Sequence, residues 1–270
     1  MSIVLENLRR DVRMRLETDR QLSTAWIIIP ILPFVGFLIY IFVVLAAIFT
    51  AFSSFRFNST SGTPPTTNAP AFAVGFFGLL AAFYLVLFVV GILWAVLLYK
   101  LVKRRNMHFH RQMFLYDDLI ALAKELGAKK GIDTSLQLNN LDRTSREVKL
   151  EETEKSAPLW AILSLFIGIL GYYVFYFQMK DFYRHERRQD IFLDDLSKLM
   201  TTVGIPVNLP RNSYPIPDRS FILYLILAII TAGLFNIYWV YTLVTDPNNH
   251  FRHQALLEDT ILAQATPQFG

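Results

Sequence analysis

The chain of 270 residues contains no cysteine. This absence excludes disulfide bonds, thiolate metal sites and a cysteine nucleophile. Charge is also scarce, because Asp, Glu, Lys and Arg make up only 18% of the chain, whereas hydrophobic residues make up 53%. Soluble domains usually carry more charge and fewer apolar residues. The composition therefore predicts a membrane protein.

Four stretches lack charged residues altogether, at residues 25–55, 70–99, 159–177 and 221–245. Each reaches the roughly 18–20 residues that a helix needs to cross a hydrocarbon core about 30 Å thick. Helices are expected because no water satisfies backbone groups there. We therefore expect an all-α, polytopic integral protein of the cell membrane. The first two stretches are longer than one span needs, and Pro30, Pro33 and Gly91 are their expected breaks.

The distribution of basic residues predicts the orientation of the chain. Segment 1–24 carries five arginines, residues 103–158 carry eleven Lys and Arg, and residues 56–69 carry only Arg56. By the positive-inside rule, the amphipathic N-terminal segment 1–24 and the helix and linker of 103–156 are cytoplasmic. Residues 25–102 then form a transmembrane hairpin with an external loop at 56–69. Asn58 in that loop begins an Asn-Ser-Thr sequon and is a candidate glycosylation site.

The third and fourth stretches have two alternative placements. Full spans are the first expectation, but a full third span would put residues 183–220, with six Lys and Arg, outside the cell. The alternative is a re-entrant wedge that bends near Gly168 or Gly233 and returns to the cytoplasmic face. Both alternatives leave the two termini in the cytoplasm.

A motif of the form Gly-x7-Tyr-x8-His-x3-Gln-x4-Asp occurs three times without a gap. The copies are Gly91, Tyr99, His108, Gln112 and Asp117; Gly168, Tyr176, His185, Gln189 and Asp194; and Gly233, Tyr241, His250, Gln254 and Asp259. The second repeat (157–219) comprises a membrane segment, an amphipathic helix and a proline-rich linker. The third (220–270) comprises a membrane segment and a C-terminal helix.

Each copy predicts an amphipathic cytoplasmic helix. His and Gln, four residues apart, share one face, whereas Asp points to the opposite side. Apolar residues 7 and 11 positions after the His extend the His/Gln face, which is therefore expected to be buried, as a packing or partner contact. Asp181 and Asp246 are expected N-caps, with Pro247 in the first turn. Gly127 and Gly204 are the expected C-terminal ends.

Residues 229–241, Ile-Ile-Thr-Ala-Gly-Leu-Phe-Asn-Ile-Tyr-Trp-Val-Tyr, are also distinctive. They resemble the Thr-x-Gly-x4-Tyr-Trp-x-Tyr signature of an uncharacterised family of small prokaryotic membrane proteins. Residues 167–176 resemble it more weakly and lack the Trp. The resemblance implies a prokaryotic integral membrane protein, and it brings no activity, cofactor or partner.

Three classes of function compete. A metal-dependent membrane enzyme could use the His and Asp of the repeats, because imidazole and carboxylate suit zinc or iron. The Asp residues face away from the His residues, however, and nearby arginines oppose a cation. A transporter or channel would need ionisable groups within the stretches, and they hold none.

The sequence therefore favours a non-enzymatic structural or accessory membrane subunit without a cofactor or bound metal. Its expected partners are membrane lipid and other membrane subunits, or further copies of itself, and such a scaffold could organise the bilayer. No basic patch with interleaved aromatic residues indicates nucleic acid.

Overall fold

The structure, a computed structural model, describes residues 2–60 and 69–269. Within these ranges the chain is helical and contains no strand, so the all-α prediction is confirmed. The elements in chain order are α1 (Ile3–Thr18), η1 (Thr24–Ile28), α2 (Leu32–Thr60), α3 (Ala69–Lys130), α4 (Ser135–Glu151), α5 (Ala157–Phe166), α6 (Ile169–Thr202), α7 (Phe221–Ile230), α8 (Phe235–Ala265) and η2 (Thr266–Phe269).

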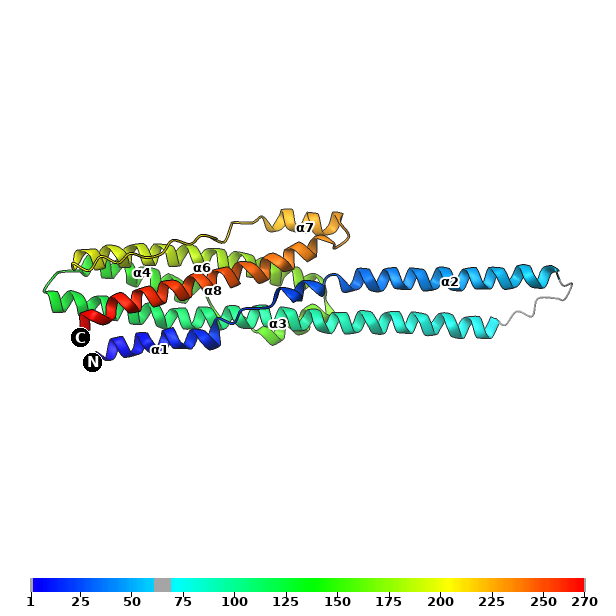
Figure 1. Cartoon of the computed structure of the whole chain (residues 1–270), viewed down its shortest axis with the longest axis horizontal. Helices are drawn as coiled ribbons and strands as arrows, with labels where there is room; N and C mark the ends of the chain where they lie inside the picture. The colour runs from blue at the N-terminus through cyan, green and yellow to red at the C-terminus, as the bar shows by residue number, and fades with distance from the viewer. Residues whose placement is uncertain (1, 61–68, 270) are drawn as a thin grey trace.

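Helices α2 and α3 lie side by side as an antiparallel hairpin that extends beyond the rest of the molecule (Figure 1). Two segments, Thr24–Thr50 and Gly75–Lys130, are long and apolar enough to cross a membrane. The expected break at the prolines agrees with the start of α2 at Leu32. The break expected at Gly91 is wrong, because α3 continues through it to Lys130. Asn58 lies near the end of α2, within the predicted external loop, and its side chain is outside the described part of the chain.

The third and fourth apolar stretches are each interrupted in the structure. Helix α5 ends at Phe166 and α6 begins at Ile169, while α7 ends at Ile230 and α8 begins at Phe235. Each short helix packs against the helix that follows it. In the second case Gly233 has a φ of +93°, a conformation that glycine adopts at little cost. Neither stretch is a candidate span, so two of the four expected spans are supported.

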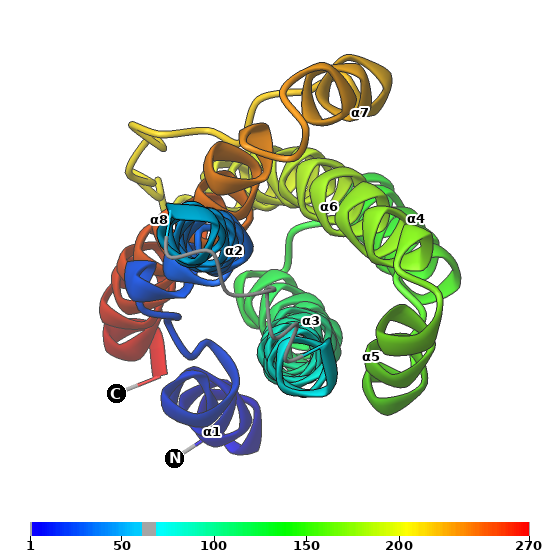
Figure 2. The same ribbon diagram turned by 90° about the vertical axis from the view of Figure 1, so that its right-hand side faces the viewer.

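Helices α3, α6 and α8 run in the same direction away from the apolar end of the molecule (Figure 1). Viewed along the long axis, they surround a common centre, with α1 beside α3 and α4 on the outside of α6 (Figure 2). Because the three repeats are parallel, equivalent residues of each repeat meet at the same height. The core of this bundle includes the predicted apolar stripe, namely Leu115, Leu119, Phe192, Leu196, Leu257 and Ile261.

The predicted helix ends are only partly correct. Asp181 and Asp246 lie inside α6 and α8, so they are not N-caps, and Pro247 is inside α8 as well. Each helix instead continues from its membrane-side turn without a break. Gly204, with a φ of +79°, follows the end of α6 as expected. Gly127 does not end α3, and Gly131, with a φ of +66°, takes that position.

Candidate metal centre

The three histidines of the repeats converge in the centre of the bundle. The Nε2 atom of His108 on α3 lies 3.1 Å from Nε2 of His185 on α6 and 3.2 Å from Nε2 of His250 on α8. All three side chains are buried, with at most 1% of any residue exposed. One ligand atom from each residue can be chosen so that all lie within 4.8 Å of one another. The parallel repeats therefore create a compact cluster of three imidazoles.

A carboxylate contacts the other ring nitrogen of each histidine. The Nδ1 atoms of His108, His185 and His250 lie 3.0 Å from Asp19, 2.8 Å from Glu152 and 3.2 Å from Glu186, respectively. Asp19 follows α1, Glu152 is the C-cap of α4, and Glu186 lies on α6 next to His185. Three elements that are far apart in the sequence thus supply the same kind of partner.

These contacts assign the ring protons. An ionised carboxylate only accepts hydrogen bonds, so each neutral imidazole donates from Nδ1 and leaves Nε2 without a proton. Burial lowers the pKa of His108 to about 3, although Asp19 acts in the opposite direction. Burial also lowers the pKa of His250. In this tautomer the three Nε2 lone pairs face one another, which is an arrangement that a cation would stabilise.

Two of the three histidine pairs have the spacing of ligands on a tetrahedral transition metal ion. With Zn–N bonds of about 2.0–2.1 Å and tetrahedral angles, neighbouring ligand nitrogens lie about 3.3 Å apart. The Nε2 separations from His108 to His185 and to His250, 3.1 and 3.2 Å, are close to this value. Metal-bound histidines commonly donate their second N–H to a carboxylate, which fixes the tautomer and the ring orientation. Here all three have such a partner.

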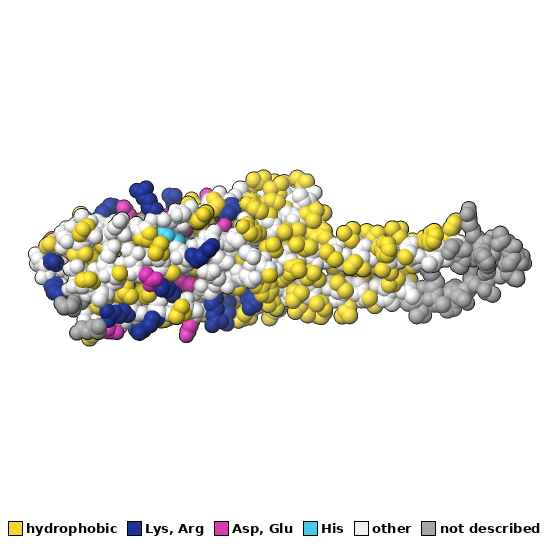
Figure 3. Space-filling view, in the orientation of Figure 1, with side chains coloured by type: hydrophobic (Ala, Val, Ile, Leu, Met, Phe, Trp, Pro, Cys, Tyr) yellow, Lys and Arg dark blue, Asp and Glu magenta, His cyan; other side chains and the backbone are white. Residues whose placement is uncertain are grey.

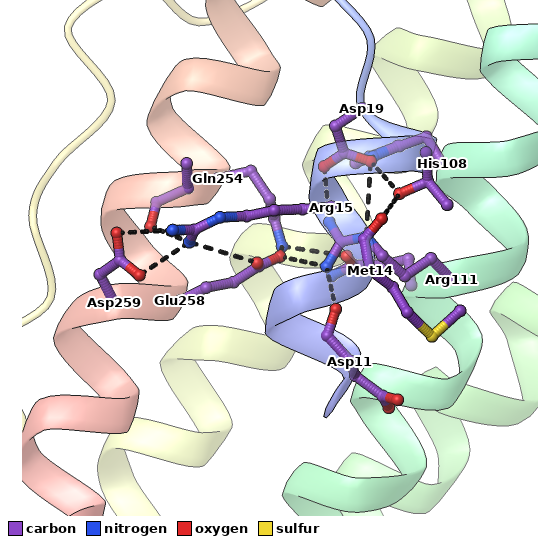
Figure 4. Close-up of polar contacts among 12 residues, drawn as sticks. Asp11, Met14, Arg15, Asp19, His108, Arg111, Gln254, Glu258 and Asp259 are labelled. Carbon is purple, nitrogen blue, oxygen red and sulfur yellow. Dashed lines mark hydrogen bonds and ion pairs between the residues drawn. The ribbon is translucent and has the colours of Figure 1, made fainter. Parts of the chain in front are cut away.

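The carboxylates are themselves held in place. Arg111 donates to Asp19 Oδ2 at 2.6 Å and to Glu258 Oε1 at 2.7 Å, both within a buried network (Figure 4). Arg188 donates to Glu152 Oε1 at 3.0 Å. Burial alone would raise the pKa of Asp19, but its contacts with His108 and Arg111 outweigh burial and hold that pKa far below its usual range. Asp19 is therefore an anion at neutral pH.

Two further layers enclose the histidines. Phe109, Phe182 and Phe251 form a buried aromatic cluster, and the Phe109 ring stacks on His185 with ring centroids 4.4 Å apart. The repeat glutamines follow one helical turn further along. Gln254 donates to Gln112 at 2.9 Å and accepts a hydrogen bond from Gln189. The imidazoles thus lie between an aromatic layer and an amide layer, away from bulk water.

The residues of the repeat motif do not all meet in the structure. The structure brings together its histidines and its glutamines, whereas its aspartates are exposed and form ion pairs elsewhere. Asp117 pairs with Lys149 at 2.7 Å, Asp194 with Lys198 at 2.6 Å and Asp259 with Arg15 at 2.8 Å. Tyr99 and Tyr176 are half-buried and Tyr241 is exposed. Gly168 and Gly233 lie in the turns before α6 and α8, and Gly91 lies within α3.

Sequence reasoning missed the three carboxylates of the centre. Asp19 and Glu152 lie outside the repeats, so no periodicity marks them. Glu186 did leave a signal, because copies one and three have Phe109 and Phe251 directly after the histidine where copy two has an acid. Arg111 and Arg188, two of the arginines expected to oppose a cation, are paired with acids.

Comparisons with protein-family models, curated proteins and solved structures find no match to this chain.

Proposed function

We propose that this protein is a membrane-anchored scaffold whose bundle of α3, α6 and α8 is held together by one transition metal ion of the zinc class. The observation that carries this proposal is the convergence of three buried Nε2 atoms, each on an imidazole fixed by a carboxylate. The ion would take His108, His185 and His250 as ligands.

The ligand set narrows the choice of metal. Three neutral imidazoles suit zinc, copper, iron and nickel better than magnesium or calcium, which prefer oxygen. A fourth, tetrahedral position would take a water molecule. Such a water could supply a donor for Gln189 Oε1, which is buried and has no hydrogen-bond partner within the described residues.

Burial of the site favours a structural ion over a catalytic one. His108 and His185 have no exposed surface, and a substrate would have to displace the aromatic or amide layer to reach the ion. A metal-dependent enzyme therefore remains the weaker proposal. Transport receives no support from the two long apolar stretches, because residues 25–55 and 70–99 hold no Asp, Glu, Lys, Arg or His.

The proposed membrane placement follows the charges. Helix α2 and the first half of α3 would cross the cell membrane, while the bundle and both termini would lie in the cytoplasm with most of the basic residues. The N- and C-terminal ends do lie at the same end of the molecule, away from the far end of the α2–α3 hairpin (Figure 1). The exposed apolar sides of α2 and α3 would contact lipid, other membrane subunits or further copies. We also propose that the chain belongs to the prokaryotic family whose signature residues 229–241 resemble.

The metal content of the purified full-length protein tests the function. We expect about one zinc-class ion per chain in the wild type, and its loss in a His185→Gln variant. His110→Ala is the matched control, because His110 is on α3 and exposed. Replacing zinc by Co²⁺ should give the visible absorption of a tetrahedral site. Protein that binds no metal, or a His185→Gln variant that binds as tightly as wild type, contradicts the proposal.

A further inference from the structure

The two short apolar hairpins, α5 with the start of α6 and α7 with the start of α8, are built alike at their polar ends. Ser156 and Ser220 are the N-caps of α5 and α7, and each accepts a hydrogen bond from the third residue of its helix. The residue before each Ser is basic and pairs with an acid of the returning helix. Lys155 binds Asp181 at 2.9 Å, and Arg219 pairs with Asp246. Each hairpin therefore has a charged base.

The outer surfaces and tips of both hairpins are apolar and uncovered. Phe166 at the first tip is 78% exposed, and Ile230 at the second is 74% exposed. Other exposed apolar side chains of the hairpins are Leu159, Ile162, Ile167, Ile169, Ile222, Leu223, Ile226, Ile229 and Leu234. Removing apolar side chains from water is favourable, so this surface strongly favours an apolar environment.

The packing of the first hairpin sets the depth that it reaches. A Cβ atom at Gly91 would lie 3.2 Å from Leu165, so the tip region of α5 touches α3 at this glycine. Gly91 is nine residues from Lys100, the first charged residue of α3. At 1.5 Å per residue this is about 13 Å, less than half of a bilayer. The second hairpin is at a similar level, since a Cβ at Gly233 would lie 3.5 Å from Phe34 near the start of α2.

Among the described residues, only those of α2 and α3 continue beyond both tips. Residues 70–90 of α3 extend about 31 Å further. The cross-section of the apolar part is therefore large next to the bundle and small at the other end, and the space-filling view shows this taper (Figure 3). The apolar surface runs without interruption from the hairpins onto α2 and α3, and charged side chains gather on the bundle side of it.

We propose that the two hairpins are inserted as wedges among the lipid acyl chains of the leaflet that faces the bundle, and that the protein thereby prefers membranes that are convex on that side. The occupant of the apolar surface is lipid because this surface continues the one on α2 and α3. Adding four helical segments to one leaflet and none to the other expands the first leaflet alone. The inference rests on the membrane placement in the proposed function and is independent of the metal.

Depth measurements test the insertion, and the cysteine-free chain allows single labels. Phe166→Cys and Ile230→Cys mark the tips, Leu45→Cys marks α2, and Leu136→Cys marks the start of α4 in the bundle; all four native side chains are exposed. Fluorescence of the labels would be measured in vesicles whose lipids carry a nitroxide either near the headgroup (shallow) or near the end of the acyl chain (deep). We expect the tip labels to be quenched best by the deep nitroxide, which matches a depth of about 13 Å below Lys100, and the Leu136 label by a water-soluble quencher.

The other outcomes separate the two proposals. A label at Leu45 that lipid nitroxides do not quench contradicts the membrane placement itself. A lipid-quenched Leu45 label together with water-accessible tips contradicts only the wedges. Tips shielded from both quenchers mean that a protein covers them, which also overturns the wedges.

A sorting experiment tests the preference for curvature. Protein reconstituted with the bundle outward should be enriched, per unit lipid, on small vesicles relative to large ones. The variant Phe166→Ser/Ile230→Ser should lose that enrichment while keeping the oligomeric state and helix content of wild type in detergent. Leu136→Ser, on α4, is the control and should sort as wild type does. Equal density of wild type on small and large vesicles overturns the proposal.

Discussion

Among single residues, His108 is the histidine of the cluster that contacts both of the others at hydrogen-bond distance. Its Nδ1 contacts Asp19, and its Nε2 faces both other histidines. It also packs against Phe251, with ring centroids 4.6 Å apart. Changing this residue would alter the metal ligands, the docking of the N-terminal segment and the aromatic layer together. The carboxylates offer cleaner tests because each contacts one histidine.

Glu152→Gln should weaken metal binding without removing a ligand. The amide keeps the shape of the side chain but loses the negative charge that orients His185 and makes its Nε2 more basic. Loss of a partner of this kind usually costs about 10- to 100-fold in affinity. Competition with a calibrated chelator measures it. Glu154→Gln, at a nearby exposed acid, is the control and should change the metal affinity little. Equal metal affinity in Glu152→Gln and wild type would show that Glu152 is not part of the centre.

Asp118 should make stability depend on pH. Burial and the neighbouring Asp11 raise the pKa of Asp118 to about 6. Asp11 Oδ2 is buried without a partner among the described residues, and a protonated Asp118 can donate to it. Because the unfolded pKa is about 3.9, the folded state holds this proton more tightly. The stabilisation that protonated Asp118 gives to the folded state is therefore lost as the pH rises from about 4 to about 6.

The expected result is that Asp118→Asn raises Tm at pH 7.5 and leaves it nearly unchanged at pH 4. Thermal unfolding with a chelator present would separate this effect from metal binding. Glu17→Gln, at an exposed acid of α1, should show no such pH difference. A Tm that falls at pH 7.5 in Asp118→Asn would mean that the ionised carboxylate stabilises the fold.

At the level of elements, α1 is joined to the bundle through buried charge. Arg111 on α3 bridges Asp19, just after α1, and Glu258 on α8 (Figure 4). The Arg111 side chain has no exposed surface and that of Glu258 has 1%. Arg15 on α1 extends the network to Asp259, at 2.8 Å. The N-terminal helix is thus part of the folded bundle.

Arg111→Met should destabilise the bundle by about 3–5 kcal/mol, because it removes the nearest cation from two buried acids. Urea unfolding in detergent with a chelator present measures the free energy of unfolding. Arg13→Met, on the exposed side of α1, should change it by less than about 0.5 kcal/mol. Adding Glu258→Gln to Arg111→Met should restore part of the loss. A loss no larger than that of Arg13→Met would contradict the role of this network.

The elements also show what the sequence could predict. Exact spacing of three repeats was enough to identify the His/Gln face, because a helix places residues four apart on one side. It could not distinguish a span from a hairpin, since 19 or 25 uncharged residues fit both. That choice depends on turns near Gly168 and Gly233 and on contact with α3. The helix starts expected at Asp181 and Asp246 were wrong because these acids pair with Lys155 and Arg219 instead.

For the whole molecule, the histidine cluster joins parts of the chain that are far apart. His108 and His185 are 77 residues apart, and His108 and His250 are 142 apart. The carboxylates add α4 and the segment after α1. An ion bound at this point would therefore cross-link every helix that leaves the apolar base, so its binding energy would appear in the stability of the entire bundle.

Zinc should accordingly raise the unfolding midpoint of the bundle. An ion that binds only the folded state at 1,000 times its Kd adds about 4.1 kcal/mol. We expect the Tm of the wild type to rise with zinc concentration. Circular dichroism measures this Tm in protein from which metal has been removed and to which zinc is then added stepwise. His253→Ala, at a half-buried histidine of α8 outside the cluster, should keep the rise and His185→Gln should lose it. Since His185 contacts Nε2 of only one other histidine at hydrogen-bond distance, His185→Gln should remain folded without zinc. A zinc-dependent rise that survives in His185→Gln would place the ion elsewhere in the protein.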